Sequence, residues 1–266
     1  MLLNFHMLGW WRWALGAVCA LVAAFLLLPI LFIIALSFGD SRWLIFPPPG
    51  WTLKWYEELF SDPRWLDAAF TSFKVAAVVA VLSVILGFLA SMALVRGTFR
   101  GRAFLRGFFL MPMVMPVVVL AIALYATFLW LGIAGTFVGF VLAHLVIALP
   151  FAIIAISGAL EGFDKSIEDA AILCGASPWE ARLRVTLPSI KHGLFSAAIF
   201  SFLISWDEVV LAIFMASPRL QTLPIKVWGT LRQDLSPVIA AASTLLIALT
   251  VALMVLAAFT RKGKKQ

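Results

Sequence analysis

The chain has 266 residues, of which 64% are hydrophobic and 12% charged, and its mean hydropathy is +1.07. Soluble domains carry about 25% charged residues, and no soluble fold hides so much apolar surface, so lipid is the solvent for most of this chain. The net charge of +7 does not indicate nucleic-acid binding, because the basic residues gather beside the ends of apolar segments instead of forming one long stripe.

Six apolar segments are long enough to cross about 30 Å of hydrocarbon as helices that rise about 1.5 Å per residue. Their apolar runs are continuous, which excludes spanning strands, since strands alternate. The predicted spans are residues 13–37, 68–95, 104–130, 136–160, 193–216 and 238–259. The first run is too long for the core of a signal peptide, so we expect it to be retained. The prediction is an all-α integral membrane protein with one transmembrane domain, residues 1–266.

The distribution of Lys and Arg predicts the orientation. With the N-terminus in the cytoplasm, thirteen basic residues lie inside and seven outside, and the densest clusters are all inside. Both termini are therefore predicted to be cytoplasmic. The inside set is Arg12, Arg96, Arg100, Arg102, Arg106, Lys165, Arg182, Arg184, Lys191, Arg261, Lys262, Lys264 and Lys265; the outside set is Arg42, Lys54, Arg64, Lys74, Arg219, Lys226 and Arg232.

The outer loop between the first two spans is too long to be a simple turn. Three prolines and a glycine at 47–50 exclude a helix there. Apolar side chains then recur at helical spacing, which predicts a short amphipathic helix on the outer membrane interface. These side chains are Trp51, Trp55, Leu59 and Phe60. A tryptophan belt at the lipid headgroups explains them without any binding role.

The cytoplasmic loop, residues 161–192, contains the most specific pattern. From Asp169 it reads acid-Ala-Ala, three residues, Gly175, nine residues, then Val-Thr-Leu-Pro at 185–188. This pattern resembles the EAA loop of binding-protein-dependent ABC importer permeases, E-A-A-x3-G-x9-I-x-L-P. Asp169 stands at the family's Glu position, directly after Glu168, and Val185 replaces Ile. Both departures keep the charge sign or the apolar character.

The residues of this loop also predict its local structure. Ser166 and Asp169 have the spacing of a capping box at the start of a short helix. Ala170, Ala171 and Leu173 or Cys174 give that helix a face of mostly small residues, which lets another surface approach closely. Gly175 is expected to end the helix, and Ser177-Pro178 to start a second one. The alternative interpretation is a helical loop that only covers the end of the bundle.

The resemblance implies a type I ABC importer permease fold of six transmembrane helices. It also implies that the loop holds the coupling helix, which is seated in a groove of the ATPase subunit. The residues that match the motif, or flank it, are predicted to couple the chain to the ATPase. They are Glu168, Asp169, Ala170, Ala171, Gly175, Leu187 and Pro188.

The chain is similar over nearly its whole length to the permeases of spermidine/putrescine importers. SWDEVV at 205–210 and TLPIKVW at 222–228 resemble the signatures of that subgroup, although these strings are looser than the loop motif. The resemblance implies a polyamine or a related cationic amine as substrate. Amino-acid-like amines remain an alternative, and iron and phosphonate importers share the fold, so the fold alone does not choose among substrates.

Asp207 and Glu208 are the only adjacent acids in the six apolar segments. Ionisable groups within a span are costly and usually functional, and two carboxylates in a low-dielectric channel suit a substrate that carries ammonium groups. We therefore predict that they line the substrate path, in the outer half of the span. Ser205 on the same polar stripe, with Trp206 and Tyr125 as aromatic walls, completes the predicted set. The alternative is that both acids lie in the wet outer interface and pair with Lys226 or Arg232.

His144 lies in the fourth apolar segment without a nearby acid in sequence, which favours a helix-to-helix hydrogen bond over a proton relay. Pro112, Pro116 and Pro150 are expected to kink their spans. Cys19 and Cys174 have no neighbours that suit metal binding, so neither a disulfide nor a metal site is predicted.

The chain contains no phosphate-loop motif and no catalytic constellation. It is therefore predicted not to be an enzyme and to hold no cofactor, with ATP and Mg bound by partner ATPase subunits. The resemblance implies a second permease, two ABC ATPases and a periplasmic solute-binding protein in a bacterial inner membrane. Resemblance to the polyamine group favours a paralogue as the second permease. A stand-alone secondary transporter is the alternative, but it leaves the coupling loop unexplained. It also predicts a matching charged pair in the other half of the chain, and the second predicted span has none.

Overall fold

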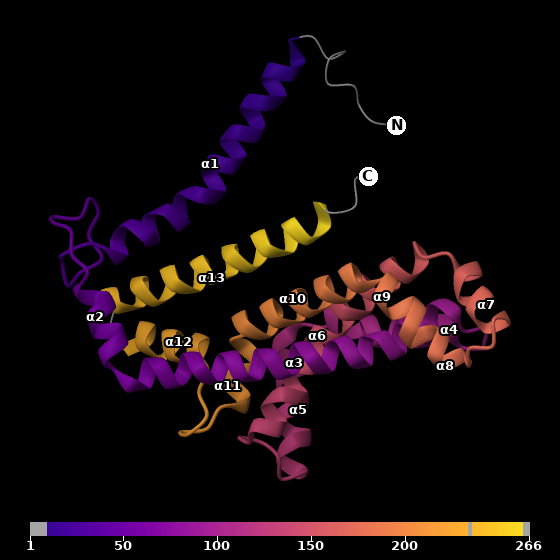
Figure 1. Cartoon of the computed structure of the whole chain (residues 1–266). Helices are drawn as coiled ribbons and strands as arrows, with labels where there is room; N and C mark the ends of the chain where they lie inside the picture. The colour runs from indigo at the N-terminus through magenta and orange to yellow at the C-terminus, as the bar shows by residue number, and fades with distance from the viewer. Residues whose placement is uncertain (1–9, 234–235, 263–266) are drawn as a thin grey trace. The chain divides into compact units, whose positions relative to one another are not determined.

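The computed structural model describes residues 10–233 and 236–262 (Figure 1). The chain divides into two compact units, Met1–Asp62 with Thr230–Ile247, and Pro63–Gly229 with Ala248–Gln266. Within the described ranges the regular structure is helical, and extended pairing is limited to two isolated bridges. The predicted all-α class is confirmed.

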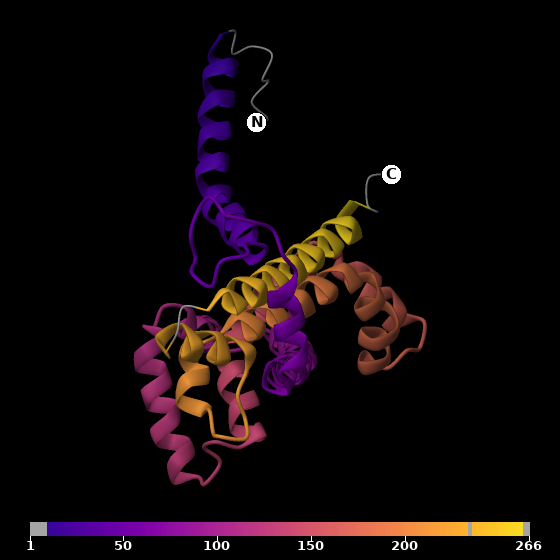
Figure 2. The ribbon, with the colours of Figure 1, turned by 90° about the vertical axis from the view of Figure 1, so that its left-hand side faces the viewer.

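The first unit begins with α1, Trp11–Ser37, an apolar helix with mostly exposed side chains. A loop follows beneath it (Figure 2), where Gly39 bridges Trp51 and the Trp55 indole N–H donates to the Gly39 carbonyl over 2.6 Å. The predicted amphipathic helix is present as α2, Lys54–Ser61. However, Trp51 precedes this helix, and Trp55 is buried because its indole fastens the loop, so the predicted belt does not include it.

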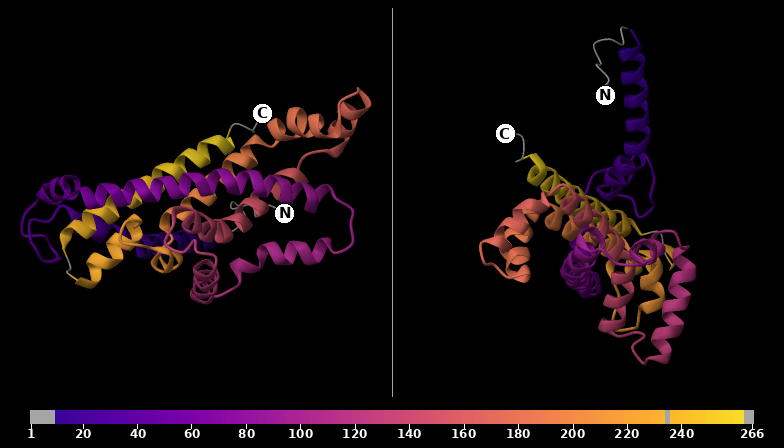
Figure 3. Two further views of the ribbon diagram at one scale, coloured as in Figure 1. Left: turned by 90° about the horizontal axis from the view of Figure 1, so that it is seen from below. Right: turned by 90° about the vertical axis from the view of Figure 1, so that its right-hand side faces the viewer.

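The second unit is built on three long helices that run beside one another (Figures 1 and 3). They are α3, Pro63–Arg96; α6, Phe137–Glu161; and α10, Lys191–Asp207. Small residues let these backbones approach closely. A Cβ added to Gly87 of α3 would lie 3.0 Å from the Cβ of Ala152, and one added to Gly193 of α10 would lie 2.3 Å from that of Ala159. The Ser91 hydroxyl crosses from α3 to donate to the Ile153 carbonyl of α6, over 3.2 Å.

Four helices among the described residues are long and apolar enough to cross a membrane: α1, α3, α6 and α13, Pro237–Lys262. Two further helix pairs pass the same criterion but are bent at a break. The described part of the chain therefore has four such helices, or up to six spans if each bent pair is counted as one. Outside these helices and pairs, the described residues form α2, α7 of the loop described below, α11, Val210–Met215, and α12, Leu223–Gln233.

The predicted third span, residues 104–130, is broken and not only kinked. The structure has α4, Arg102–Leu110, a 3-10 turn at Met111–Met113 and α5, Val117–Trp130, with a bend of 100°. The kink expected from Pro112 and Pro116 is thus a full break. Proline has no N–H to donate to the preceding turn, and Pro116, in an extended conformation, stands directly before α5.

The predicted single fifth span, 193–216, is wrong. α10 ends at Asp207, Glu208 is extended with ψ of 118°, and α11 covers only Val210–Met215. The Glu208 carboxylate accepts a hydrogen bond from the Leu211 N–H over 2.9 Å, so it caps the new helix instead of continuing the old one. At its other end, α10 forms a bent pair of 74° with the helical stretch Pro178–Ser189.

Candidate functional site

The loop after α6 folds into a knob of short helices at one end of the long helices of the second unit (Figure 3). We define the knob as residues 164–189. It contains α7, Lys165–Leu173; α8, Pro178–Ala181; a π-helical turn, Arg182–Thr186; and α9, Leu187–Ser189.

The knob begins at a cap that differs from the prediction. The Asp164 carboxylate accepts a hydrogen bond from the Ser166 N–H over 2.9 Å, so Asp164 is the cap and the predicted Ser166–Asp169 box is wrong. Asp164 caps α7 because it lies directly before the helix in an extended conformation and has a short side chain that can accept a hydrogen bond. The Ser166 N–H lowers the pKa of Asp164 by stabilising its charged form. The cap therefore strengthens α7 at neutral pH, and this contribution is lost as the pH falls through the lowered pKa.

The first helix of the knob ends at Gly175, as predicted. Gly175 has φ of +97°, its N–H donates to the Ile172 carbonyl over 3.0 Å, and the Ala176 N–H donates to the Ala171 carbonyl over 3.1 Å. This pair of bonds is the Schellman arrangement, whose left-handed residue is usually glycine. The turn between α7 and α8 is therefore fixed by backbone hydrogen bonds.

The second helix starts at Ser177-Pro178, as predicted. The Ser177 hydroxyl accepts from the Glu180 N–H over 3.2 Å, and the Glu180 carboxylate accepts from the Ser177 N–H over 3.0 Å. This reciprocal capping box lowers the pKa of Glu180 because the charged carboxylate receives the backbone N–H.

The predicted coupling residues occupy two sides of the knob. Asp169, Ala170 and Gly175 are exposed. Leu173 and Cys174 of the predicted small-residue face are exposed beside them, and Leu173 is 89% accessible. Ala171 and Leu187 are half-buried, whereas Pro188 is exposed. Exposed apolar side chains surround this face: Ile167, Ile172, Trp179 and Leu183. An exposed apolar face of this kind is typical of a surface that meets another protein.

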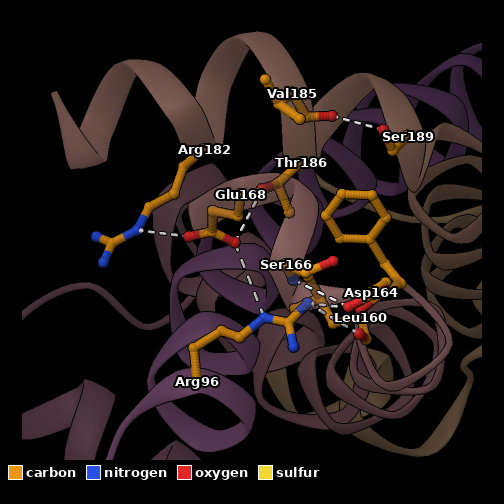
Figure 4. A network of polar contacts seen from close by, with 10 residues as sticks. Arg96, Leu160, Asp164, Ser166, Glu168, Arg182, Val185, Thr186 and Ser189 are labelled. Atoms are coloured by element: carbon orange, nitrogen blue, oxygen red, sulfur yellow. Dashed lines mark hydrogen bonds and ion pairs between the residues drawn. The ribbon is translucent and has the colours of Figure 1, made fainter. Parts of the chain in front are cut away.

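Glu168 differs from the other coupling residues because it is turned inward and is only 5% exposed (Figure 4). Its carboxylate accepts a hydrogen bond from Thr186 and faces two guanidinium groups, those of Arg96 and Arg182. From the sequence, both arginines were recognised only as topology signals, and Thr186 had no predicted role. Thr186 stands within the loop motif, which could have indicated a role for it. Its hydrogen-bond partner Glu168 lies in another helix, α7, so the sequence does not show the contact.

The predicted path residues fall into two environments. Asp207 is exposed and Glu208 half-buried at the break between α10 and α11. Ser205 and Trp206 are buried instead, with the Trp206 ring stacked 5.7 Å from that of Phe202. Glu208 does not continue a helical stripe from Ser205, because α10 ends at Asp207 and Glu208 is extended.

Tyr125 is not buried as Ser205 and Trp206 are. It is 37% exposed on α5, with its ring centre 6.3 Å from that of Phe214 of α11. Lys226, an alternative partner for the two acids, has its ammonium 5.6 Å from the ring centre of Trp65.

His144 makes the predicted helix-to-helix hydrogen bond. Its Nδ1 lies 2.9 Å from the Ser205 hydroxyl, which joins α6 to α10, and the imidazole is fully buried beside the Phe140 ring at 4.8 Å. This bond lies two residues before Asp207, so it fixes the end of α10 from which the break begins.

Solved structures with a similar fold include chains of ABC transporters. One is a chain of the bacterial alginate ABC transporter in complex with an alginate-pentasaccharide-bound periplasmic protein, with a TM-score of 0.68, 15% identity and 97% of both chains covered. Another belongs to an amino acid ABC transporter with histidines, with a TM-score of 0.58, 13% identity and coverage of 78% of this chain and 98% of that one. At these identities the likeness shows the fold.

Similar sequences identify the family to which the chain belongs. The chain is 31% identical over 249 residues to the spermidine/putrescine transport system permease protein PotC of Escherichia coli (strain K12), covering 94% of each protein. It is 34% identical over 234 residues to the putrescine transport system permease protein PotI of the same strain, covering 84% of this chain and 82% of that protein. The model of the binding-protein-dependent transport system inner membrane component family matches residues 83–265. The chain belongs to this family of ABC importer permeases, as the coupling-loop motif predicts.

Proposed function

We propose that the chain forms half of the substrate pathway of an ATP-driven importer for polyamines, such as putrescine or spermidine. The observation that carries the proposal is the identity of 31% to a spermidine/putrescine permease across 94% of both proteins. A sulfoquinovosyl glycerol permease of Agrobacterium fabrum is 29% identical but covers only 75% of this chain. The exposed Asp207 carboxylate and half-buried Glu208 at a helix break supply the negative charge that a passing ammonium group requires.

The proposed assembly contains a second permease, which we expect to be a paralogue, two ABC ATPases and a periplasmic solute-binding protein. Two observations support it: the exposed apolar face of the knob, and a similar permease fold crystallised with a periplasmic protein. In this assembly the ATPases bind ATP and Mg, and the present chain supplies the path through the bacterial inner membrane. Amino-acid-like amines, iron and phosphonates remain the alternative substrates.

The function is tested by reconstituting the four kinds of subunit in proteoliposomes and following labelled putrescine and spermidine. We expect uptake that requires both ATP inside and the binding protein outside. Uptake of sulfoquinovosyl glycerol, iron or phosphonate in place of polyamines would contradict the substrate. Uptake without ATPase subunits would instead indicate a secondary transporter.

Neutralising the acids at the break should reduce polyamine uptake severalfold or more. A carboxylate about 4 Å from an ammonium is worth about 4 kcal/mol at an effective dielectric constant of about 20. Asp207→Asn and Glu208→Gln remove this charge, and the glutamine oxygen can still accept from the Leu211 N–H. The measurement is the rate of labelled putrescine uptake at equal permease expression.

Glu57→Gln, at an exposed acid of α2, provides the matched control and should transport normally. The affinity of the binding protein should not change, because that protein captures the substrate before the permease does. Normal uptake by both path variants would leave the two carboxylates without a role in the path.

The basic residues predict where tags on the chain should report. A tag in the loop at Arg100 and one after Lys265, which lies outside the described residues, should both report the cytoplasm. A tag near Pro48 should report the periplasm. The measurement is a pair of reporters that are each active on only one side of the membrane. A single tag on the opposite side contradicts the predicted six-span topology.

A further inference from the structure

The knob contains one acid that does not face outward. Glu168 is the only Asp, Glu, Lys or Arg side chain in the buried class among the residues whose side chains the structure describes. Its sequence neighbours Ile167 and Asp169 are both exposed. Buried charges are costly unless they are paired and hydrogen-bonded, so the contacts of this carboxylate define what it does.

Each carboxylate oxygen of Glu168 faces a different guanidinium group (Figure 4). Oε2 lies 3.8 Å from Nε of Arg96, at the end of α3, and also accepts a hydrogen bond from the Thr186 hydroxyl over 3.1 Å. Oε1 lies 3.7 Å from Nε of Arg182. We call Glu168, Arg96, Arg182 and Thr186 the Glu168 joint. It connects α7 to α3 and to the π-helical turn.

Arg96 extends the joint to a further helix. Its Nη2 donates to the Phe163 carbonyl over 2.8 Å and to the Leu160 carbonyl over 3.3 Å, where α6 ends. One guanidinium therefore binds the end of α6 while its Nε faces Glu168. Only arginine has enough donors in a fixed fork to make these contacts together.

The knob also meets the long helices through apolar packing, since Leu187 packs against a cluster that includes Phe88 and Met92 of α3. A cavity of about 260 Å³ lies beside the joint, between the end of α3 and the knob. It is lined by Leu89, Met92, Ala93, Arg96, Gly97, Trp179 and Arg182. The Arg96–Glu168 pair is a direct connection between α3 and α7 beside this cavity.

The π-helical turn gives the joint its route to α10. It spans Arg182–Thr186, so it carries two members of the joint, and through Leu187–Ser189 it leads into α10 at Lys191. Single π-helical turns are wider than α-helical ones and recur at functional sites. The contacts of α7 therefore lead to α3 and α6 through Arg96, and to α10 through the turn.

We propose that Glu168 is a positioning residue for coupling: its inward carboxylate locks the knob to α3, α6 and the π-helical turn, so that movement imposed on the knob reaches all three long helices. This inference rests on the proposed importer function. The proposal gives two adjacent acids different roles, because Asp169 is exposed whereas Glu168 is buried and acts inside the chain. A disconnected knob should still hold the ATPase, but it should no longer transmit its movement.

The test uses the complete transporter in proteoliposomes, with Glu168→Gln in this chain. We expect the ATPase subunits to copurify in normal amounts and the ATPase rate without binding protein to stay close to wild type. Stimulation of that rate by the loaded binding protein, and uptake, should fall about tenfold, within the usual range of coupling between two sites. Glu168→Asp should restore part of the stimulation, because it keeps the charge at a shorter reach.

Glu161→Gln is the matched control, because Glu161 is an exposed acid whose pair with Arg106, at 3.2 Å, lies at the same end of α6. It should behave like wild type, as exposed pairs contribute little. Arg96→Lys is a second variant should Glu168→Gln fail to assemble. It keeps the charge but cannot make all the contacts of the guanidinium, so stimulation should fall while assembly persists.

Two outcomes would overturn the proposal. One is wild-type stimulation and uptake in Glu168→Gln. The other is a fall of basal ATPase rate, stimulation and uptake in proportion to lost complex in both variants, which would make the joint merely structural. Failure of the proposed function is distinguishable, because it appears in the wild-type protein as absent polyamine uptake. The stimulation ratio then tests the joint with whichever loaded binding protein is active.

Discussion

Replacing Gly175 with tryptophan should reduce uptake to background while the membrane-spanning helices remain inserted. Gly175 has φ of +97°, and the left-handed conformation costs other residues about 1–2 kcal/mol. An added Cβ would meet nothing within 4 Å, so the strain is in the backbone and not in a clash. The indole would then stand on the exposed face of the knob that the ATPase is proposed to bind. The measurement is labelled polyamine uptake, with expression and copurified ATPase determined on the same sample.

Gly175→Asn separates the two causes. Asparagine tolerates the left-handed conformation better than other residues with a Cβ, and it is smaller than tryptophan. We expect it to keep most of the uptake. Wild-type uptake by the tryptophan variant at normal expression would show that this turn has no part in coupling.

Replacing Gly193 with leucine should prevent α10 from packing against α6. An added Cβ at this position lies 2.3 Å from the Cβ of Ala159, a distance that real Cβ atoms essentially never show. Overpacking in a filled core costs about 1–3 kcal/mol or more, and here the backbones themselves must separate. We expect a lower midpoint of thermal unfolding in detergent and a lower yield of monodisperse protein.

Gly158→Leu is the control for the same change in a helix. Gly158 is exposed on α6, and an added Cβ there meets nothing within 4 Å. Leucine has a higher helix propensity than glycine, so this variant should be as stable as wild type or slightly more stable. Equal thermal midpoints for the two leucine variants would contradict the close approach of α6 and α10.

The sequence predicted the unbroken helices well and the broken ones poorly. Hydropathy measures whether a segment prefers lipid, and it located α1, α3, α6 and α13 within a few residues. It does not report whether the backbone is continuous. The break at Pro112–Pro116 was expected only as a kink, and the break at Glu208 has no proline. There the Glu208 carboxylate accepts a hydrogen bond from the Leu211 N–H, and hydropathy does not detect such an interaction.

The knob was partly predictable because its turns depend on local residues. Gly175 and Ser177-Pro178 act through neighbours a few residues away, so the sequence contains the whole signal. The cap at Asp164 was missed because two acceptors competed for the same helix start. The ion pair of Glu168 with Arg96 of α3 was missed for another reason. Adjacent residues of a helix point about 100° apart, so only one of Glu168 and Asp169 can face inward, and the sequence does not indicate which one.

The break after Asp207 also determines how strongly this site should attract a cation once both carboxylates have been neutralised. Each peptide unit contributes a dipole along the helix axis, so the C-terminal end of α10 carries a partial negative charge of about half an elementary charge. Because α10 stops at Asp207 instead of running through to α11, this end lies within the chain's apolar region and not beyond it. Its backbone should attract an ammonium group even when both carboxylates are neutral. Asp207→Asn and Glu208→Gln combined should therefore slow polyamine uptake without abolishing it, and the residual rate should depend less on ionic strength than the wild-type rate.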